Sequence, residues 1–425
     1  MNLLEEYRWR GMLQDYTHGT DDALRGGSIT AYIGFDPTAS SLHVGSLMPI
    51  MGLVHLQRMG HNPLVLLGGQ TGLVGDPSGK AEERPVLPKA QVEENLSGIK
   101  SQLEHFLDFE SSVNPARTVN NGSWLGELQM VDFLRDVGKY FSVSSLLSKE
   151  SIKRRVKDED SGISFSEFSY VLLQAYDFMA LNDKYGCTFQ MGGSDQWGNI
   201  TAGIQLIRRA RNQKAYGITY PLVTGPDGKK FGKTEAGTIW LDPERTSPYR
   251  FYQFWMNTDD SVVIQYLKQF TLLESEVIQE LQAIHEERPH ERSAHKRLAN
   301  EITGLVHGEQ GLSSAKVATE VLFGGELQGL TADEIEDVFS DVPSSEMSKS
   351  EMAGEGVSVL DVVARSGLTK SRSESRRAIE GGGLYLNNIR VTDVDRKIEV
   401  DDAADGRFFV LRKGKKNYHL IRLLS

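Results

Sequence analysis

Residues 29–59 decide the fold, and they read ITAYIGFDPTASSLHVGSLMPIMGLVHLQRM. The run Ile29–Phe35 is apolar and contains β-branched residues, which predicts a buried strand. From His43 to Met59 apolar residues recur at roughly helical spacing, so a helix should pack along one side on a sheet. Pro63–Gly68 is then a second predicted strand. A strand, a helix and a strand in this order form a βαβ unit, which predicts a parallel α/β sheet.

The same alternation continues through the first half of the chain. Cys187–Met191 and Ile218–Val223 predict further strands, and Gly- and Pro-rich loops follow several of these runs. Ligands of open α/β sheets bind at the carboxyl ends of the strands. We therefore expect the functional residues in these loops.

The pattern changes after Pro248 to helical stretches at Ser261–Phe270, Glu274–Glu287 and His290–Val306, with no convincing strand among them. Residues 341–356 are polar and rich in Ser, Glu and Gly, which is typical of a linker. The sequence therefore predicts a catalytic α/β domain at 1–247, a helical domain at 248–340, a linker at 341–356 and a small α+β domain at 357–425.

Within the last module, Val359–Ser366 and Ser373–Glu380 are predicted helices. Leu384–Val391 should form a hairpin that turns at Asn387 and Asn388. The module holds 14 Lys and Arg against 9 Asp and Glu, whereas the first 356 residues hold 33 against 49. A basic module on an acidic body fits docking of an anionic partner such as RNA, and it fits an ordinary solvated surface equally well.

The amino-acid composition indicates which broad class of protein this chain belongs to. The chain has 425 residues, 39% of them hydrophobic and 25% charged, as in an ordinary globular protein of two or three domains. Its first residues lack a signal-peptide pattern, and no stretch approaches the roughly 18 apolar residues of a membrane span. We therefore expect a cytoplasmic protein without membrane contact. The single cysteine, Cys187, lies in an apolar run and is interpreted as core packing.

The first candidate site joins a strand to a helix over Phe35–Ser46. Free N–H groups and the helix dipole make such a helix start a site for phosphate. Thr38 and His43 can add donors, and Gly45 allows close approach of a nucleotide to the backbone. An ordinary N-cap with a hydrogen-bonded histidine is the alternative for His43 taken alone.

The second candidate site, Asp227–Thr234, carries Lys229, Lys230 and Lys233 between glycines. Such a loop can close over a polyphosphate and neutralise a departing pyrophosphate, although a lysine-bearing surface turn is commoner. The literal motif Met347-Ser348-Lys349-Ser350 is set aside because it lies in the predicted linker, where no sheet is expected to position it.

The third candidate site is one face of the predicted helix Ser164–Tyr185, which opens with a possible capping box of Ser164 and Glu167. Tyr170, Gln174 and Asp177 share this face. The neighbouring residues are apolar, so the helix should be buried on most sides, and a polar stripe there needs partners. We interpret the stripe as part of a pocket; a solvent-facing stripe is the alternative.

The two loops together resemble the signature motifs of class I aminoacyl-tRNA synthetases. Four segments resemble the bacterial tyrosyl-tRNA synthetases within that class: Tyr32–Thr38, Gly72–Lys80, Gln190–Asn199 and Lys230–Thr234. Val357–Val391 resembles the S4-type RNA-binding module that often ends these enzymes. The resemblance implies a Rossmann-type catalytic domain, an all-helical domain and a small α+β S4-like domain.

The resemblance also implies roles for individual residues. Tyrosine would be bound by Tyr32, Asp76, Tyr170, Gln174, Asp177, Gln190 and Gln196, with Tyr32 and Asp177 on its hydroxyl and Asp76, Tyr170 and Gln174 on its ammonium group. ATP would be bound by Gly34, Asp36, Gly45, Ser46, Gly193, Asp195, Leu222, Val223 and Lys233. The phosphates would be contacted by Thr38, His43, Lys80, Arg84, Lys230, Lys233 and Thr234.

By the same resemblance the enzyme would form tyrosyl-adenylate from ATP and tyrosine and then charge tRNA(Tyr) through the helical and S4-like domains. Magnesium would accompany ATP, no cofactor would be tightly bound, no protein-held metal site is expected, and the chain would form a homodimer. Two positions depart from the class pattern: Ser46 replaces a frequent histidine, and Phe231-Gly232 replaces Met-Ser. The alternatives are a tryptophanyl enzyme, a small-molecule adenylyltransferase, and an RNA-binding protein with an inactive catalytic half.

Overall fold

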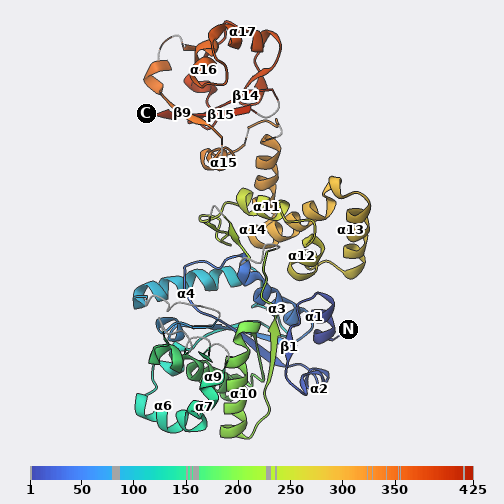
Figure 1. Cartoon of the computed structure of the whole chain (residues 1–425), viewed down its shortest axis with the longest axis vertical. Coiled ribbons are helices and arrows are strands. Elements are labelled where there is room, and N and C mark those ends of the chain that lie inside the picture. Colours follow the sequence, from blue (N-terminus) through green and yellow to red (C-terminus); the bar gives the residue numbers. More distant parts are fainter. Residues whose placement is uncertain are drawn as a thin grey trace. The chain divides into compact units, whose positions relative to one another are not determined.

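Figure 1 shows the computed structural model, which describes residues 2–78, 87–149, 152–153, 156, 162–225, 231–234, 237–322, 324–327, 329–340, 342–352, 354, 356–414 and 417–424. The chain forms two compact units. Unit 1 comprises Met1–Asp242 and Asn257–Val306, and unit 2 comprises Pro243–Met256 and His307–Ser425. The segment 248–340, expected as a helical domain, is therefore shared between the two units.

A six-stranded sheet forms the middle of unit 1, in the order β1-β6-β5-β2-β3-β4. All neighbours from β6 to β4 are parallel, and β1 at the edge is antiparallel. The bounds are β1 Asp15–Tyr16, β2 Thr30–Phe35, β3 Asn62–Leu67, β4 Arg117–Asn120, β5 Phe189–Gly193 and β6 Tyr216–Tyr220. The four predicted strands are confirmed with end shifts of a few residues, and so is the Rossmann-type parallel sheet.

Helices cover both faces of this sheet (Figure 1). On one face lies α3, Leu47–Arg58, preceded by a 3₁₀ turn, η1, Val44–Ser46. The other face carries α9, Phe165–Tyr185, and α10, Trp197–Arg211, whose apolar residues share one core with Tyr32 and Leu64. Cys187 lies in this core, as expected. The capping box of α9 is confirmed, since Ser164 and Glu167 exchange hydrogen bonds.

Helix α3 is buried on more sides than its sequence predicted. Nine of its residues are buried, including His55, because α12, Val263–Phe270, and α1, Leu3–Trp9, also pack on it. The other helices of unit 1 are α2 Thr20–Arg25, α4 Lys89–Leu103, α5 Gly122–Leu125, α6 Met130–Asp136, α7 Val143–Leu147, α13 Ser275–Glu287 and the first part of α14 Ser293–Val321. The predicted helices of this region are thus confirmed.

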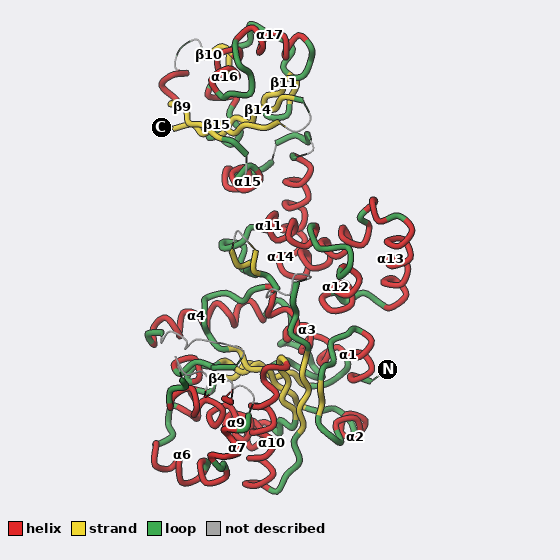
Figure 2. The backbone as a smooth tube through the Cα atoms, in the orientation of Figure 1, coloured by secondary structure: helices red, strands yellow, loops and turns green. Residues whose placement is uncertain are grey.

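Unit 2 contains the rest of α14, which is interrupted at Gly308, and a second sheet in the order β12-β11-β14-β15-β9 (Figure 2). The elements are α11 Pro248–Met256, α15 Ala332–Val338, β9 Ser344–Ser348, β10 Val357–Ser358, α16 Val359–Arg365, α17 Arg372–Glu380, β11 Leu384–Leu386, β12 Ile389–Arg390, β13 Lys397–Ile398, β14 Phe408–Lys413 and β15 Asn417–Leu424. The predicted hairpin turn is confirmed, because Asn387 and Asn388 both have positive φ.

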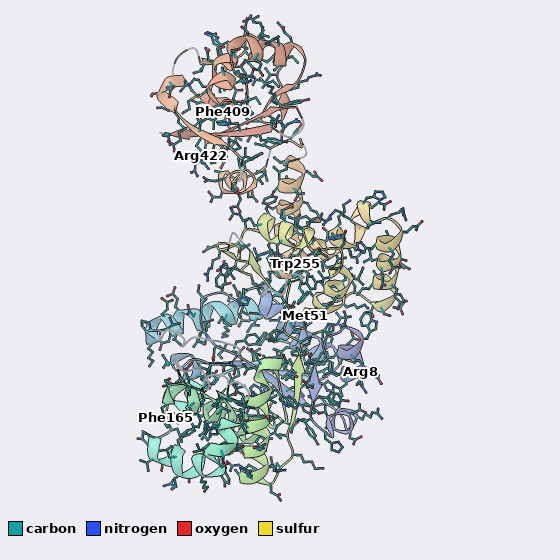
Figure 3. The ribbon with its side chains drawn as sticks, in the orientation of Figure 1. Arg8, Met51, Phe165, Trp255, Phe409 and Arg422 are labelled. Carbon is teal, nitrogen blue, oxygen red and sulfur yellow. The ribbon has the colours of Figure 1, made fainter. Side chains whose placement is uncertain are left out.

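Apolar cores lie on both faces of this second sheet. Phe409, labelled in Figure 3, belongs to the core with α16 and α17, and Phe408 belongs to the core with α14 and α15. Because β14 side chains alternate between faces, one strand joins both cores. A cut near Asp341 would therefore remove Phe408, Val410 and Leu420 from the core that holds α15.

The linker interpretation of 341–356 is wrong for its central residues. Ser344–Ser348 form β9, which pairs in parallel with β15, and Met347 is buried in the core with α16. Composition misled here because a polar edge strand exposes most side chains and buries only one face. The motif Met347-Ser348-Lys349-Ser350 was expected to lack a sheet, but its first two residues belong to β9. This sheet is in unit 2, so the motif has a structural role there.

None of the helices in the described part of the chain combines the length and apolar character needed to cross a membrane.

Candidate active site

A cavity of about 370 Å³ opens at the carboxyl ends of β2 and β5. Strand β2 pairs with β3 on one side and with β5 on the other. From this point β3 and β4 follow in one direction and β5 and β6 in the other, so the cavity lies where the strand order reverses. Ligands of doubly wound sheets bind at this switch point. The walls come from β2, the loop Asp36–Ser46, helix α9 and the segment that ends β5.

The buried end of the cavity holds Tyr32 and Asp177, each only 1% exposed. The Tyr32 hydroxyl has no hydrogen-bond partner in the part of the chain that the structure describes. Burial and the nearby Asp177 carboxylate raise the pKa of Tyr32, so its hydroxyl stays protonated. A buried hydroxyl without a partner is costly unless a ligand completes the site.

Asp177 is fixed by two donors. Trp124 Nε1 donates to Asp177 Oδ1 at 2.6 Å, and Asn121 Nδ2 donates to Asp177 Oδ2 at 3.0 Å. Burial raises the pKa of Asp177 to about 7, while the two hydrogen bonds act in the opposite direction. The carboxyl group is therefore oriented and close to its titration point at neutral pH.

A chain of hydrogen bonds links Asp177 to the middle of the cavity. Asn121 Nδ2 also donates to Thr71 Oγ1 at 3.0 Å, and Thr71 Oγ1 donates to Asp36 Oδ1 at 2.8 Å. Tyr170 completes the chain by donating to Asp36 Oδ2 at 2.5 Å. Connected polar groups of this kind hold one another in place and predetermine the shape of the pocket.

Asp76 belongs to a second network. Gln196 Nε2 donates to Asp76 Oδ2 at 2.7 Å, and Gln174 Nε2 donates to Gln196 Oε1 at 3.2 Å. Asn199 Nδ2 donates to Gln174 Oε1 at 2.9 Å. Carboxylate and amide oxygens thus converge beside Tyr170, an arrangement suited to an ammonium group.

The loop before α3 forms the open end of the cavity, where Thr38, His43, Gly45 and Ser46 line the wall. His43 Nδ1 accepts a hydrogen bond from Gly45 N at 3.0 Å and so caps η1. His43 therefore acts as an N-cap through Nδ1, as the alternative interpretation expected. His43 also lines the cavity. A side chain at Gly45 would clash with His43, which explains glycine here.

The described part of the second loop lies against the first. A Cβ on Gly232, whose φ is +79°, would lie 2.2 Å from Val44 Cγ2. Ile239 N donates to Gly232 O at 3.0 Å and Val44 N donates to Ile239 O at 3.0 Å. Phe231 stacks on Phe270 with ring centroids 5.5 Å apart. The predicted meeting of the two loops is thereby confirmed at the backbone, where Lys233–Thr234 form β7 opposite β8, Gly237–Thr238.

The cavity wall includes most of the predicted residues: Tyr32, Gly34, Asp36, Thr38, His43, Gly45, Ser46, Asp76, Tyr170, Gln174, Asp177, Gln190, Gly193 and Gln196. Asp195 and Leu222 border Gly193, since a Cβ there would lie 2.6 Å from Asp195 Oδ1 and 3.2 Å from Leu222 Cδ2. Val223 is not among the residues that line the cavity. Lys80, Arg84 and Lys230 lie outside the described residues, and Lys233 and Thr234 are described by backbone alone.

Sequence reasoning missed Asn121, Trp124, Thr71 and Asn199. Asn121 and Trp124 follow β4 directly, so the rule that carboxyl ends carry function would have found them had β4 been recognised. That strand was missed because Arg117–Asn120 is short, polar and at the sheet edge. Asn199 ends the resembling segment Gln190–Asn199 but was assigned no role, and Thr71 gave no signal of its own.

Comparison with known proteins gives a consistent result. The family model described as tRNA synthetases class I (W and Y) matches residues 24–324, and the model of a tyrosine–tRNA ligase SYY-like C-terminal domain matches residues 334–421. Tyrosine–tRNA ligase of Roseiflexus castenholzii is 54% identical over 99% of both chains. The protein of that name from Bacillus caldotenax is 50% identical over 99% of this chain and 100% of its own.

Among solved structures, a C-terminally truncated mitochondrial tyrosyl-tRNA synthetase of Aspergillus nidulans is similar with a TM-score of 0.68 and 30% identity, covering 76% of this chain and 94% of its own. A tryptophanyl-tRNA synthetase of Encephalitozoon cuniculi has a TM-score of 0.52 at 10% identity, over 72% of this chain and 87% of its own. The second likeness concerns the fold alone.

Proposed function

The chain belongs to the tyrosine–tRNA ligase family of class I tRNA synthetases, and from this premise we propose that its cavity binds tyrosine at the buried end and ATP at the open end. The enzyme uses ATP to attach tyrosine to tRNA. One observation carries the assignment of the buried end: the unpartnered Tyr32 hydroxyl and the Asp177 carboxylate line the cavity, are each only 1% exposed, and can both hydrogen-bond to a substrate hydroxyl.

Each network then has a proposed task. A tyrosine side chain fills the buried end, where its hydroxyl donates to Asp177 and accepts from Tyr32. Its ammonium group lies between Asp76, Gln174 and Tyr170, near the acceptors described above. Gln190 and Gln196 border the same space. The three carboxylates of Asp36, Asp76 and Asp177 favour a cationic substrate group in this part of the cavity.

The open end is proposed to take ATP. Gly34 and Gly193 allow close approach of the adenosine, beside Asp195 and the 55% exposed Leu222. Thr38, His43, Gly45 and Ser46 face the phosphates, and the family resemblance adds Lys80, Arg84, Lys230, Lys233 and Thr234 as further proposed phosphate contacts. Mg²⁺ enters with the phosphates of ATP, as part of the substrate.

The reaction follows from these positions. The tyrosine carboxylate is ionised at neutral pH, so its attack on the α-phosphorus needs alignment and charge stabilisation but no general base. Pyrophosphate leaves toward the lysine-bearing loop, and tyrosyl-adenylate remains. The terminal ribose hydroxyl of tRNA then takes the tyrosyl group. ATP–pyrophosphate exchange assayed across the amino acids tests this: tyrosine should support exchange, and exchange with tryptophan instead would refute it.

Binding of tRNA by the basic C-terminal module is proposed from charge and exposure. Helix α17 carries Arg376 and Arg377 on its exposed side. Charge reversal of both should weaken tRNA binding and lower the salt slope by roughly one for each lost phosphate contact. Filter binding at several salt concentrations measures this, and tyrosine-dependent exchange is the control that should stay unchanged. If aminoacylation of tRNA were undiminished in this variant, α17 would not be a tRNA-binding element. These substitutions are preferable to truncation, which would expose the core beneath α15.

A homodimer is proposed from exposed apolar side chains on α6, α7 and the start of α9. They are Met130, Val131, Leu134, Val143, Leu147 and Phe165, and the last is 73% exposed and labelled in Figure 3. An exposed apolar surface of this kind marks an interface, and a second copy of the chain is the occupant that the family implies.

The substitution Phe165→Asp tests this surface. It should shift the protein from dimer to monomer in sedimentation velocity, because a charge would be buried in the apolar contact. Val113→Asp is the matched control, since Val113 is 83% exposed and lies in the loop before β4. Equal sedimentation of both variants would place the interface elsewhere. A cytoplasmic location also remains a proposal, supported by the use of charged tRNA in translation.

A further inference from the structure

Three segments of unit 1 bring Asp260, His285 and His295 together. Asp260 precedes α12, His285 lies in the last turn of α13 and His295 lies in the first turn of α14. One ring nitrogen of each histidine and one carboxylate oxygen of Asp260 all lie within 4.8 Å of one another. None of the three side chains lines the cavity described above.

The Nε2 atoms of both histidines face oxygen atoms. His295 Nε2 lies 3.1 Å from Asp260 Oδ1 and 3.1 Å from the carbonyl oxygen of Thr258. His285 Nε2 lies 3.2 Å from the carbonyl oxygen of Asp260. Both Nδ1 atoms are buried and have no hydrogen-bond partner among the described residues. The carbonyl oxygens can only accept, so each Nε2 carries the ring proton in this structure, and binding of a metal at Nε2 would move that proton to Nδ1.

Burial and charge suit a metal ion. The His295 side chain is fully buried, whereas the Asp260 side chain is 60% exposed, so the cluster is open to solvent on one side. One group opposes a cation: Arg292 Nη1 lies 4.0 Å from Asp260 Oδ1. The side chain of Arg292 is 40% exposed, so solvent screens part of this opposition.

We propose that Asp260, His285 and His295 bind a Zn²⁺ ion. Two imidazole nitrogens and one carboxylate oxygen form a ligand set that zinc accepts, with water in the fourth position on the open side. Mg²⁺ and Ca²⁺ prefer oxygen ligands throughout, so they fit this set poorly. Neither Nδ1 has an acceptor in the described residues, and such support is worth roughly 10- to 100-fold in affinity. The site should therefore bind zinc reversibly.

The bound ion would join the loop before α12 to the end of α13 and the start of α14. This differs from the expectation that the chain holds no metal site, and it is independent of the proposed function of the cavity. The sequence hides the site because Asp260 is far along the chain from His295, and because the tract between His285 and His295 also contains the exposed His290.

Metal-stripped full-length protein titrated with ZnCl₂ tests the proposal by calorimetry and thermal unfolding. The wild type should bind one ion at this site and unfold at a higher temperature with zinc, since a ligand specific to the folded state stabilises it. Asp260→Asn and His285→Gln should each weaken binding by at least roughly tenfold. His290→Gln, in the same tract but outside the cluster, should titrate like the wild type. Equal titration of the wild type and Asp260→Asn would overturn the proposal, as would an absence of zinc binding.

A variant of opposite sign separates a metal site from a hydrogen-bonded cluster. Arg292→Gln removes the cation nearest to Asp260 Oδ1 and should strengthen zinc binding, because less positive charge opposes the ion. If the three side chains formed only a hydrogen-bonded cluster, the loss of Arg292 would not be expected to strengthen zinc binding. Unchanged or weaker zinc binding in Arg292→Gln would count against the proposed ligand set.

Discussion

Asp177→Asn should lose roughly 10- to 100-fold of the preference for tyrosine over phenylalanine, since a hydrogen bond to a charged group is worth about 1.5–3 kcal/mol. We propose that the carboxylate accepts a further hydrogen bond from the substrate hydroxyl, which phenylalanine cannot donate. This family is itself the standing example of such discrimination, which reaches roughly 10⁵ in kcat/KM. The measurement is kcat/KM for both amino acids in ATP–pyrophosphate exchange.

Asp183→Asn is the matched control. Asp183 lies on the same helix, is 38% exposed and pairs with Arg211, so its loss should leave discrimination unchanged. Tyr32→Phe should act like Asp177→Asn, because the Tyr32 hydroxyl has no other partner among the described residues. Full discrimination in both Tyr32→Phe and Asp177→Asn would show that the hydroxyl is read elsewhere.

The same Asp177→Asn variant has a second expected signature in stability. The pKa of Asp177 is raised from 3.8 in the ordinary state to about 7 in the folded protein. Between these values the folded chain binds more protons at this group than the unfolded chain, so its contribution to stability falls as pH rises from about 4 to about 7. The Tm of the variant relative to the wild type should therefore increase between pH 5 and pH 8. A constant difference would mean that Asp177 titrates normally.

Lys233→Ala should slow formation of tyrosyl-adenylate by roughly 10²- to 10³-fold, the usual cost of losing one preorganised donor to a developing charge. Gly232 holds β7 against Val44, so the backbone places position 233 beside the phosphate loop. Binding of tyrosine should hardly change, because the buried end of the cavity is formed by other residues. Rapid-quench measurement of adenylate and equilibrium dialysis of tyrosine separate the two effects.

Lys349→Ala is the control for this prediction. Its motif, Met347-Ser348-Lys349-Ser350, has the literal form of the lysine signature but belongs to β9 and the turn after it in unit 2. Adenylate formation should be normal in Lys349→Ala. If Lys233→Ala weakened tyrosine binding as much as it slowed the reaction, the proposed contact with pyrophosphate would be wrong.

Local sequence determined much of the fold because its signals act over a few residues. Apolar periodicity fixed β2 and α3, the pair Ser164 and Glu167 fixed the start of α9, and two consecutive asparagines fixed the turn between β11 and β12. The paired loops and the polar face of α9 also pointed to the cavity. The strand, the helix and the turns depend on neighbours close in sequence, whereas the two loops were related to each other through the family resemblance.

Tertiary structure alone decided the rest. Strand β4, the donors Asn121 and Trp124, and the parallel pairing of β9 with β15 depend on partners that are distant in sequence. The raised pKa of Asp177 likewise requires burial, which no local pattern measures. Sequence by itself predicted which residues could recognise tyrosine and ATP. Only packing decided which of them lose water, and the removal of water is what makes a hydroxyl or a carboxylate selective.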